Sequence, residues 1–377
     1  MIRVLHVIGA MNRAGAETFL MNLYRSIDRK KVQFDFLVHA QGTCDYDEEI
    51  ERLGGRLFHV PRYTILNAKR YTNAVRNILK EHPENTIMHS HIGSSAPAHL
   101  KIAREEGRFT IAHSHAQTKM DSLENILFHF VSKPVRGRAD RYMACSLEAA
   151  EDRFGKTIAH SENCIIIQNG IQVDDYKRNA DLVTAAKEDL EVQGHPVFGH
   201  VGRFVHDKNH IFLLDVFKGI NVKLPDALLL LSGKGNLESM VRKAVKERGL
   251  EDKVIFLGLR SDIPHVLHAM DVFLFPSHHE GLGIALVEAQ AAGLECITST
   301  GVPEAAMCTD RAQRISLDSV ETWTQSALAA YQKASSRFDD NVQEVREAGF
   351  DMATIANQLE AFYEECDQSA KINSTGA

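Results

Sequence analysis

Long apolar runs and paired cysteines are both missing from this sequence. No run of about 18 apolar residues occurs, and a membrane-spanning helix needs about that length. The six cysteines are widely scattered without a C-x-x-C pair, and most lie in or beside predicted strands, where small apolar residues fit. We therefore expect reduced thiols in a cytosolic protein.

A secretory leader and an excess of basic residues are missing as well. The N-terminal run Met1–Ile8 is short, lacks a basic lead and cleavage site, and continues directly into Gly9. We expect it to form the first strand. The formal net charge of −7 argues against a protein that binds duplex nucleic acid, because such proteins gather many cations against phosphate.

The length and the pattern predict an α/β protein with two doubly wound domains. The 377 residues exceed the roughly 250 to 300 at which a single core stops growing. Strand-like apolar runs alternate with amphipathic helical segments, which is typical of a parallel sheet with crossover helices. The predicted domains are 1–175, together with a C-terminal helix at 352–366, and 195–348. We expect a linker at 176–194 and a disordered tail at 367–377.

The predicted strands place the polar motifs at the carboxyl ends of both sheets, where ligands of such folds bind. In the first domain the strands are Val4–Ile8, Val32–Val38, Arg56–Val60, Thr86–His89, Phe109–His113, Arg141–Ala144 and Ile165–Gln168. In the second domain they are Val197–Val201, Ala227–Leu231, Val254–Leu257, Val272–Phe275 and Glu295–Thr298.

The most informative motif is the segment from Glu280 to Glu288. It follows a buried strand, turns through Gly281-Leu282-Gly283, and continues as an apolar helix that starts near Gly283. Free N–H groups at a helix start bind phosphate well. Glu288, about one and a half turns further, could reach a ribose diol, and Glu280 could reach a sugar. Taken alone, two acids at this spacing are more often a turn cap and a solvated helix residue.

A second motif follows an apolar strand that ends at Gly202. Arg203 and Lys208 come next, before a helix that begins at Asn209. A planar guanidinium and a compact ammonium together suit a diphosphate leaving group. Such a pair of cations is otherwise common as simple surface decoration.

These motifs together resemble a known family. Gly202-Arg203 with Lys208, Gly233-Lys-Gly235 and Glu280 through Glu288 resemble the donor half of a retaining glycosyltransferase of family 4, among the group 1 glycosyltransferases of polysaccharide biosynthesis. Arg13-Ala-Gly-Ala-Glu17 and His113-Ser-His115 resemble the family's N-terminal half, although the family often has two glycines where this chain has Ala14-Gly15. The likeness runs over roughly residues 2 to 365.

The resemblance implies a GT-B fold, in which two Rossmann-like domains face a cleft and the last helix crosses back to the N-terminal domain. It implies transfer of a hexose from a nucleotide-sugar, with a UDP-sugar expected, to a saccharide or lipid-linked acceptor. No cofactor and no catalytic metal are expected. A sugar-nucleotide epimerase of the same fold, or a silent sugar-nucleotide-binding protein, are the alternatives.

The resemblance also assigns roles to residues. Arg203 and Lys208 would stabilise the departing diphosphate, Glu288 would hold the ribose and Glu280 the sugar. His115, or His113 in its place, would line the sugar, and Arg260 would lie by the base. The remaining donor-binding residues are Gly15, Gly202, Gly233, Gly281, Leu282 and Gly283.

Three motifs have competing interpretations. His89-Ser-His91 and His113-Ser-His115 each end a strand, so four imidazoles could bind zinc, although the sequence supplies no acid or cysteine nearby to complete the ligands. Asp45-Tyr-Asp47 imitates a metal-binding D-x-D but stands at a helix start, where we expect a cap or a first-turn role. The basic amphipathic stretch between Lys119 and Arg141 fits either a core-facing helix or contact with an anionic membrane. The first loop lacks G-x-G-x-x-G, which disfavours NAD.

Overall fold

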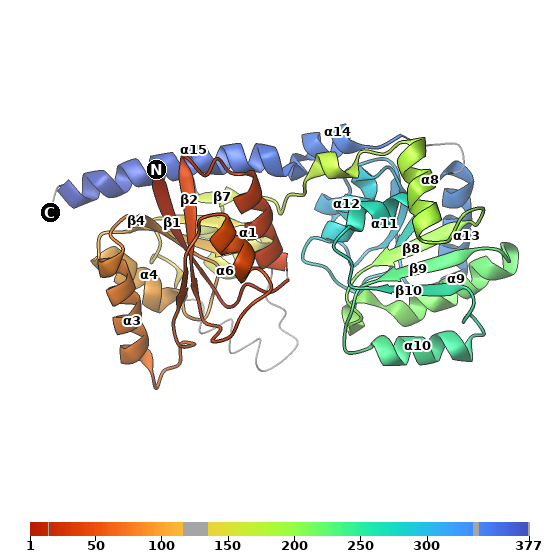
Figure 1. Ribbon diagram of the computed structural model, residues 1–377, viewed down its shortest axis with the longest axis horizontal. Helices are drawn as coiled ribbons and strands as arrows, with labels where there is room; N and C mark the ends of the chain where they lie inside the picture. The colour runs from red at the N-terminus through yellow and green to blue at the C-terminus, as the bar shows by residue number, and fades with distance from the viewer. Residues whose placement is uncertain (14, 116–134, 335–338, 376–377) are drawn as a thin grey trace. The chain divides into compact units, whose positions relative to one another are not determined.

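The computed structural model describes residues 1–13, 15–115, 135–334 and 339–375 (Figure 1). They form two compact units. Unit 1 comprises Met1–Gly170 and Met352–Ala377, and unit 2 comprises Ile171–Asp351. Each unit has one parallel sheet with helices packed on both faces, which confirms the α/β prediction.

Unit 1 is built on a seven-stranded sheet in the order β3-β2-β1-β4-β5-β6-β7. All pairs of neighbouring strands are parallel. Strand β2 is buried at every residue, which explains its unbroken apolar character, because both faces of a parallel sheet are covered by helices. The strands are β1 Ile2–Ile8, β2 Val32–Val38, β3 Leu57–His59, β4 Asn85–Ser90, β5 Phe109–Ser114, β6 Arg141–Ala144 and β7 Cys164–Ile166.

The helices of unit 1 enclose two core clusters, one on each face of the sheet. In Figure 1, α15 lies beside β1 and α1 although it comes from the end of the chain. Its Glu360 accepts a hydrogen bond from the backbone N–H of Asp28 at 2.6 Å. The helices are α1 Gly15–Ser26, α2 Asp47–Arg52, α3 Ala68–Glu81, α4 Ala96–Glu105, α6 Leu147–Phe154, α7 Lys156–Ala159 and α15 Met352–Thr375.

Unit 2 repeats this plan with a six-stranded sheet in the order β10-β9-β8-β11-β12-β13. Its strands are β8 Val197–Val201, β9 Leu228–Ser232, β10 Val254–Gly258, β11 Val272–Phe275, β12 Glu295–Ser299 and β13 Ala312–Ile315. Its α-helices are α8 Ala180–Asp189, α9 His210–Lys223, α10 Glu238–Glu247, α11 Ile263–His268, α12 Ile284–Ala291, α13 Val320–Ala334 and α14 Val342–Val345. Short 3₁₀ turns are η2 Val173–Tyr176, η3 His206–Lys208 and η4 Glu304–Ala306, and η5 Arg346–Phe350 is a π-turn.

The structure differs from the sequence predictions at three places. The range 176–194, expected as a linker, contains α8 and belongs to unit 2. The helix expected to end at 366 continues to Thr375, because Cys366, Asp367 and Ala370 are still buried against unit 1. The edge strand β13 was not predicted, since its residues are only partly buried and show no clear apolar run.

Two further expectations can be compared with the described residues. None of their helices has both the length and the apolar character that a membrane span requires. All six cysteines are free thiols, so the scattered spacing does not conceal a disulfide.

Candidate functional site

The carboxyl ends of β8, β11 and β12 are joined by their loops in unit 2. These strands are neighbours in the sheet, so the loops that follow them meet. The backbone N–H of His278 donates to the carbonyl of Asp207 at 2.7 Å, and the N–H of Glu280 donates to the carbonyl of Gly301 at 3.1 Å. The loops that carry the two predicted motifs are therefore held against each other by backbone bonds.

Lys208 and Glu280 form an ion pair at the centre of these loops. The Lys208 Nζ atom lies 2.6 Å from Glu280 Oε1, and the two side chains are only 16% and 12% exposed. The ammonium also lies 4.5 Å from the centroid of the Phe275 ring. The sequence assigned the two residues to different parts of a ligand, whereas the structure joins them. Because the pair is shielded from water, its attraction is stronger than that of a surface pair.

Arg203 differs from Lys208 in having no such partner. Its side chain is exposed, and no ion pair or hydrogen bond joins it to the rest of the described chain. Arg260, by contrast, donates two hydrogen bonds to Asp262 within its own loop, one of them 2.8 Å long. The two arginines therefore differ: the Arg203 side chain has no partner among the described residues, while the Arg260 side chain is already paired with Asp262.

Two glycines allow the loops after β8 and β9 to touch. Gly233 has a φ of +145°, and a Cβ atom placed there would lie 2.0 Å from the carbonyl oxygen of Gly202. A Cβ atom on Gly235 would lie 2.3 Å from the carbonyl oxygen of Phe204. The motif Gly233-Lys-Gly235 is thus required by backbone contact, and Lys234 between the glycines is exposed.

Helix α12 begins at the expected glycine. Gly283 has a φ of +91°, a conformation that favours glycine, and its carbonyl accepts the N–H of Leu286 at 2.9 Å. Leu282, assigned to the donor-binding set, is only 7% exposed and belongs to the core of unit 2. Its side chain is therefore an anchor for the loop, and only its backbone is available to a ligand. Gly281 beside it is exposed.

Glu288 has a partner that the sequence did not reveal. The hydroxyl of Tyr176, in the turn η2, donates to Glu288 Oε1 at 2.8 Å. Burial raises the pKa of the Glu288 carboxyl to about 7, and the hydrogen bond from Tyr176 acts in the opposite direction. Tyr176 was predicted to lie in a linker, so only the fold of unit 2 brings it to Glu288 within α12.

Family models match the chain in two adjoining parts. Residues 13–175 match Glycosyltransferase Family 4, and residues 161–327 match Glycosyl transferases group 1. The Bacillus subtilis (strain 168) protein EpsF, which carries the name of a glycosyltransferase, is 36% identical over 313 residues and covers 80% of each chain. The chain belongs to the family 4/group 1 glycosyltransferases.

Two more comparisons place the glycosyltransferase among its relatives. The capsular polysaccharide biosynthesis glycosyltransferase CapH of Staphylococcus aureus is 26% identical over 308 residues, covering 77% of this chain and 79% of CapH. The crystal structure of Anabaena HepE with UDP and glucose superposes with a TM-score of 0.74 at 18% identity, over 97% of this chain and 100% of HepE. This likeness confirms the GT-B fold.

The predicted site residues of unit 1 lie at the carboxyl edge of the unit 1 sheet. Gly15 opens α1 and is exposed, with nothing within 4 Å of a Cβ atom placed on it. His115 follows β5, and its Nε2 atom lies 2.7 Å from Nδ1 of His91. Burial lowers the pKa of His115 to about 4, so the imidazole is neutral at pH 7. The predicted contact between His115 and a sugar stays a prediction.

The two aspartates of the Asp45-Tyr-Asp47 segment accept hydrogen bonds from backbone N–H groups. Asp45 Oδ2 accepts the N–H of Arg13 at 3.0 Å, and Asp47 Oδ2 accepts the N–H of Cys44 at 2.7 Å where α2 begins. Neither contact caps α2, whose N-cap residue Tyr46 makes no side-chain cap bond, so the capping alternative is wrong. Asp47 lies in the first turn of α2, which confirms the first-turn alternative for that residue. The basic stretch between Lys119 and Arg141 lies, as far as residue 134, outside the described residues.

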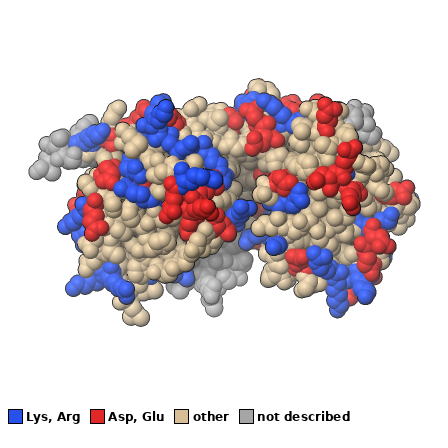
Figure 2. Space-filling model, in the orientation of Figure 1, with Lys and Arg blue, Asp and Glu red and all other residues tan. Residues whose placement is uncertain are grey.

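Positive charge is not concentrated in one broad patch on the molecular surface that Figure 2 draws. On the face drawn in Figure 2, Lys and Arg lie among Asp and Glu over both units. No broad basic surface is therefore seen on this face.

Proposed function

We propose that the protein is a retaining, metal-independent hexosyltransferase that uses a nucleotide-sugar, with a UDP-sugar as the expected donor. The acceptor would be a saccharide or a lipid-linked saccharide in the assembly of a surface polysaccharide. The observation that carries the proposal is the meeting of Arg203, the Lys208–Glu280 pair and the start of α12 at one edge of the unit 2 sheet. UDP bound to HepE and the polysaccharide role in the name of CapH support the donor and the setting.

The proposed chemistry breaks the bond between the anomeric carbon and the phosphate oxygen. The acceptor hydroxyl oxygen bonds to that carbon on the same face, and its proton passes to the departing phosphate oxygen. Arg203 and Lys208 stabilise the negative charge that grows on the diphosphate. Preorganised charge of this kind is usually the largest catalytic contribution, and two protein cations supply what a metal would otherwise supply.

The Lys208–Glu280 pair links leaving-group binding to sugar binding. In the described chain the ammonium is neutralised by the carboxylate at 2.6 Å. A diphosphate brings a second partner for Lys208, which frees one lone pair of Glu280 to accept a sugar hydroxyl. Glu280 therefore holds the hexose while keeping Lys208 oriented toward the phosphate.

Glu288 is proposed to accept hydrogen bonds from the two ribose hydroxyls. A carboxylate accepts both hydroxyls only when it is ionised, and its pKa of about 7 means that ionisation is incomplete at neutral pH. The Tyr176 hydroxyl favours the ionised form because it donates to Oε1. Nucleotide affinity should therefore depend on pH near neutrality.

Thermal stabilisation by UDP-, GDP- and ADP-sugars tests the donor site. A ligand at 100 times its dissociation constant should stabilise the folded protein by about 2.7 kcal/mol. We expect a shift with UDP-sugars that is lost in Arg203→Ala and Glu288→Ala but kept in Lys234→Ala, an exposed cation on the neighbouring loop. Stabilisation by none of the nucleotides would contradict the donor site, and a response to GDP-sugars alone would contradict the uridine assignment.

A surface loop of unit 1 supports a lipid-linked acceptor and peripheral contact at the inner face of the membrane. Ile65 and Leu66, before α3, are 89% and 100% exposed. Exposed basic residues flank them, namely Arg62, Lys69 and Arg70. Apolar residues between cations suit an anionic bilayer surface, where the side chains enter the interface and the cations meet lipid phosphates.

Co-sedimentation with phosphatidylglycerol vesicles tests this contact. The double variant Ile65→Ser with Leu66→Ser should release most of the bound protein, while Val222→Ser should not. Val222 is also largely exposed, but it belongs to α9 in unit 2. Equal sedimentation of the two variants would contradict a membrane role for the loop.

A further inference from the structure

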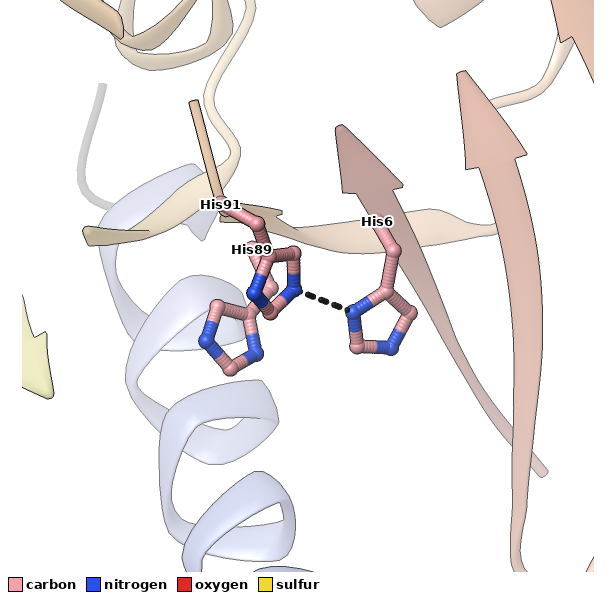
Figure 3. A group of neighbouring side chains, drawn as sticks. All are labelled: His6, His89 and His91. Atoms are coloured by element: carbon pink, nitrogen blue, oxygen red, sulfur yellow. Dashed lines mark hydrogen bonds between the residues drawn. The ribbon is translucent and has the colours of Figure 1, made fainter. Parts of the chain in front are cut away.

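The interior of unit 1 holds five histidines side by side. They come from the neighbouring strands β1, β4 and β5 and from the residues just after them, namely His6, His89, His91, His113 and His115. Figure 3 shows that three of them, His6, His89 and His91, gather on one side of the sheet next to a helix. His6 and His89 are paired residues of β1 and β4, and His91 lies two positions after His89. We call these three the imidazole triad.

One nitrogen of each ring in the imidazole triad faces the other two. The three nitrogens all lie within 4.8 Å of one another. His6 Nδ1 lies 3.0 Å from His91 Nε2, the contact drawn as a dashed line in Figure 3. The Nε2 atom of His89 is buried and has no hydrogen-bond partner among the described residues. A buried polar atom without a partner is costly, and a bound ligand would satisfy it.

The opposite nitrogens of two triad members are held from outside. His89 Nδ1 lies 2.9 Å from the hydroxyl of Tyr363 on α15. His91 Nδ1 lies 2.7 Å from His115 Nε2. When each Nδ1 carries the ring proton, the lone pair of each Nε2 atom points into the triad. Metal-binding histidines are usually oriented in this way by a partner on their other nitrogen.

The chemistry of the ligand set also suits a metal. The proton shared between His6 Nδ1 and His91 Nε2 would move to the Nε2 atom of His6, which has no partner among the described residues, when both nitrogens bind a cation. A set made only of imidazoles suits Zn²⁺, Cu²⁺, Ni²⁺ or Co²⁺, whereas Mg²⁺ and Ca²⁺ prefer oxygen ligands.

We propose that His6 Nδ1, His89 Nε2 and His91 Nε2 form a three-imidazole site for a borderline transition-metal ion, with zinc expected, and that Tyr363 and His115 orient two of the ligands. This proposal does not depend on sugar transfer, and it treats the metal as part of the unit 1 core. Zinc–nitrogen bonds of about 2.0 Å require ligand nitrogens roughly 3.3 Å apart, so only small ring movements would close the site.

A second set of three histidines overlaps the first. One nitrogen each of His91, His113 and His115 also lie within 4.8 Å of one another, and these rings line a cavity of about 40 Å³. Arg153 lines the same cavity, and its positive charge opposes a dication there. Both nitrogens of His113 lack a partner among the described residues, as does Nε2 of His6, so neither ring is oriented from outside. The imidazole triad nevertheless keeps two ligands that are held in this way, His89 by Tyr363 and His91 by His115. The imidazole triad is therefore the better site.

Titration of the metal-stripped, untagged full-length protein with Co²⁺ and Zn²⁺ tests the site. The intensity of the cobalt absorption bands reports tetrahedral ligation, and calorimetry gives the stoichiometry and affinity. We expect one equivalent in the wild type. His6→Asn and His89→Asn should weaken zinc binding at least about 100-fold, and Tyr363→Phe by about 10- to 100-fold. The matched control His113→Asn should stay within about threefold of the wild type.

The other outcomes overturn the proposal. Absence of binding, or equal affinity in the wild type, His6→Asn and His89→Asn, would show that no metal uses the imidazole triad. Binding that is lost in His113→Asn but kept in His6→Asn would assign the second set instead. Circular dichroism checks that each variant folds. If a histidine variant does not fold, Tyr363→Phe decides, because it keeps the aromatic ring: weaker binding supports the site and unchanged affinity contradicts it.

Discussion

Units 1 and 2 share the same strand order but carry different polar residues at the carboxyl edges of their sheets. In both sheets the first strand of the unit lies third from one end, and the strands run outward from it in the same order. At the carboxyl edge of unit 2 the polar residues are charged, as in the Lys208–Glu280 pair. In unit 1 the equivalent region holds neutral histidines packed against α15.

The difference shows that the strand order selects where a site forms but not its chemistry. In unit 2 the loops after β8 and β11 bring the side chains of Lys208 and Glu280 together, and the loop after β12 contacts them through the backbone carbonyl of Gly301. In unit 1 the histidines belong to the strands themselves, or follow them directly, and α15 covers them. Burial therefore lowers the pKa of the unit 1 histidines and favours their neutral form, whereas the site in unit 2 is built around the Lys208–Glu280 ion pair.

The largest difference expected between the two units is in their stability at low pH. Burial lowers the pKa of seven histidines among the described residues of unit 1, namely His6, His39, His89, His91, His99, His113 and His115. An unfolded histidine takes up a proton near pH 6.5, so the unfolded state binds more protons and stability falls as the pH falls below that value. Each histidine contributes at most about 2 kcal/mol of loss between pH 6.5 and 5.

Hydrogen exchange measured by mass spectrometry can follow both units at once. After correction for the intrinsic exchange rate, peptides from β1, β4 and β5 should lose protection at pH 5 well before those from β8 and β11. Unit 2 also has buried histidines, but among its described residues only His200, His210 and His268 have lowered pKa values. Equal loss in both units would remove the contrast drawn between them.

Removing a phosphate-facing cation should reduce the transfer rate. Lys208→Ala and Arg203→Ala should each lower the rate about 10²- to 10³-fold, by analogy with the loss of one preorganised donor to developing charge. Lys234→Ala should change the rate less than about threefold, because its side chain is exposed and has no predicted contact. Initial rates of nucleoside diphosphate release with a responsive acceptor provide the measurement. A loss in Lys234→Ala as large as in Lys208→Ala would point to a nonspecific charge effect.

The contact between the loops after β8 and β9 should not tolerate one added methyl group without a loss of stability. Gly233→Ala should destabilise unit 2 by about 2 to 4 kcal/mol, because a Cβ atom would collide with the Gly202 carbonyl. Gly249→Ala is the control, since it also has a positive φ of +68° but nothing within 4 Å of the added atom. It should cost only about 1 kcal/mol. Urea unfolding of both variants would show whether close approach or backbone conformation dominates.

The smallest effect expected concerns Glu288, and its sign is opposite to that of the histidines. Its pKa is about 7 in the folded protein and 4.5 otherwise, so its contribution is fully present below pH 4.5 and is lost as the pH rises through 7. Glu288→Gln should remove this loss, at most about 3 kcal/mol, and gain stability over the wild type between pH 5 and 8. Paired urea titrations at the two pH values measure it, and a constant difference would contradict the raised pKa.

The strands and the two motifs of unit 2 could be predicted because they depend on local patterns. Four strands, Val32–Val38, Arg141–Ala144, Val197–Val201 and Val272–Phe275, have the predicted bounds. Apolar runs that end at glycine or polar residues mark such strands, and parallel strands expose their carboxyl ends at one edge. Gly283 was likewise predicted as the start of α12.

Pairings between distant residues were not accessible to this reasoning. Tyr176 meets Glu288 across 112 positions, and His6 joins the two H-x-H segments only because β1 lies beside β4. A single tyrosine or histidine carries no local signal of such a partner. The burial of the Leu282 side chain was not predicted for the same reason, because burial depends on the elements packed around it.

The sequence by itself therefore determined the local features of the protein. These are which segments form strands, where helices start, and which loops carry cations and acids. The tertiary structure alone decided that Lys208 pairs with Glu280, that the Arg203 side chain has no partner among the described residues, and that histidines from separate strands share one buried space. The physical reason is that charge state and hydrogen bonding depend on distance and burial, which arise only when segments far apart in the chain pack together.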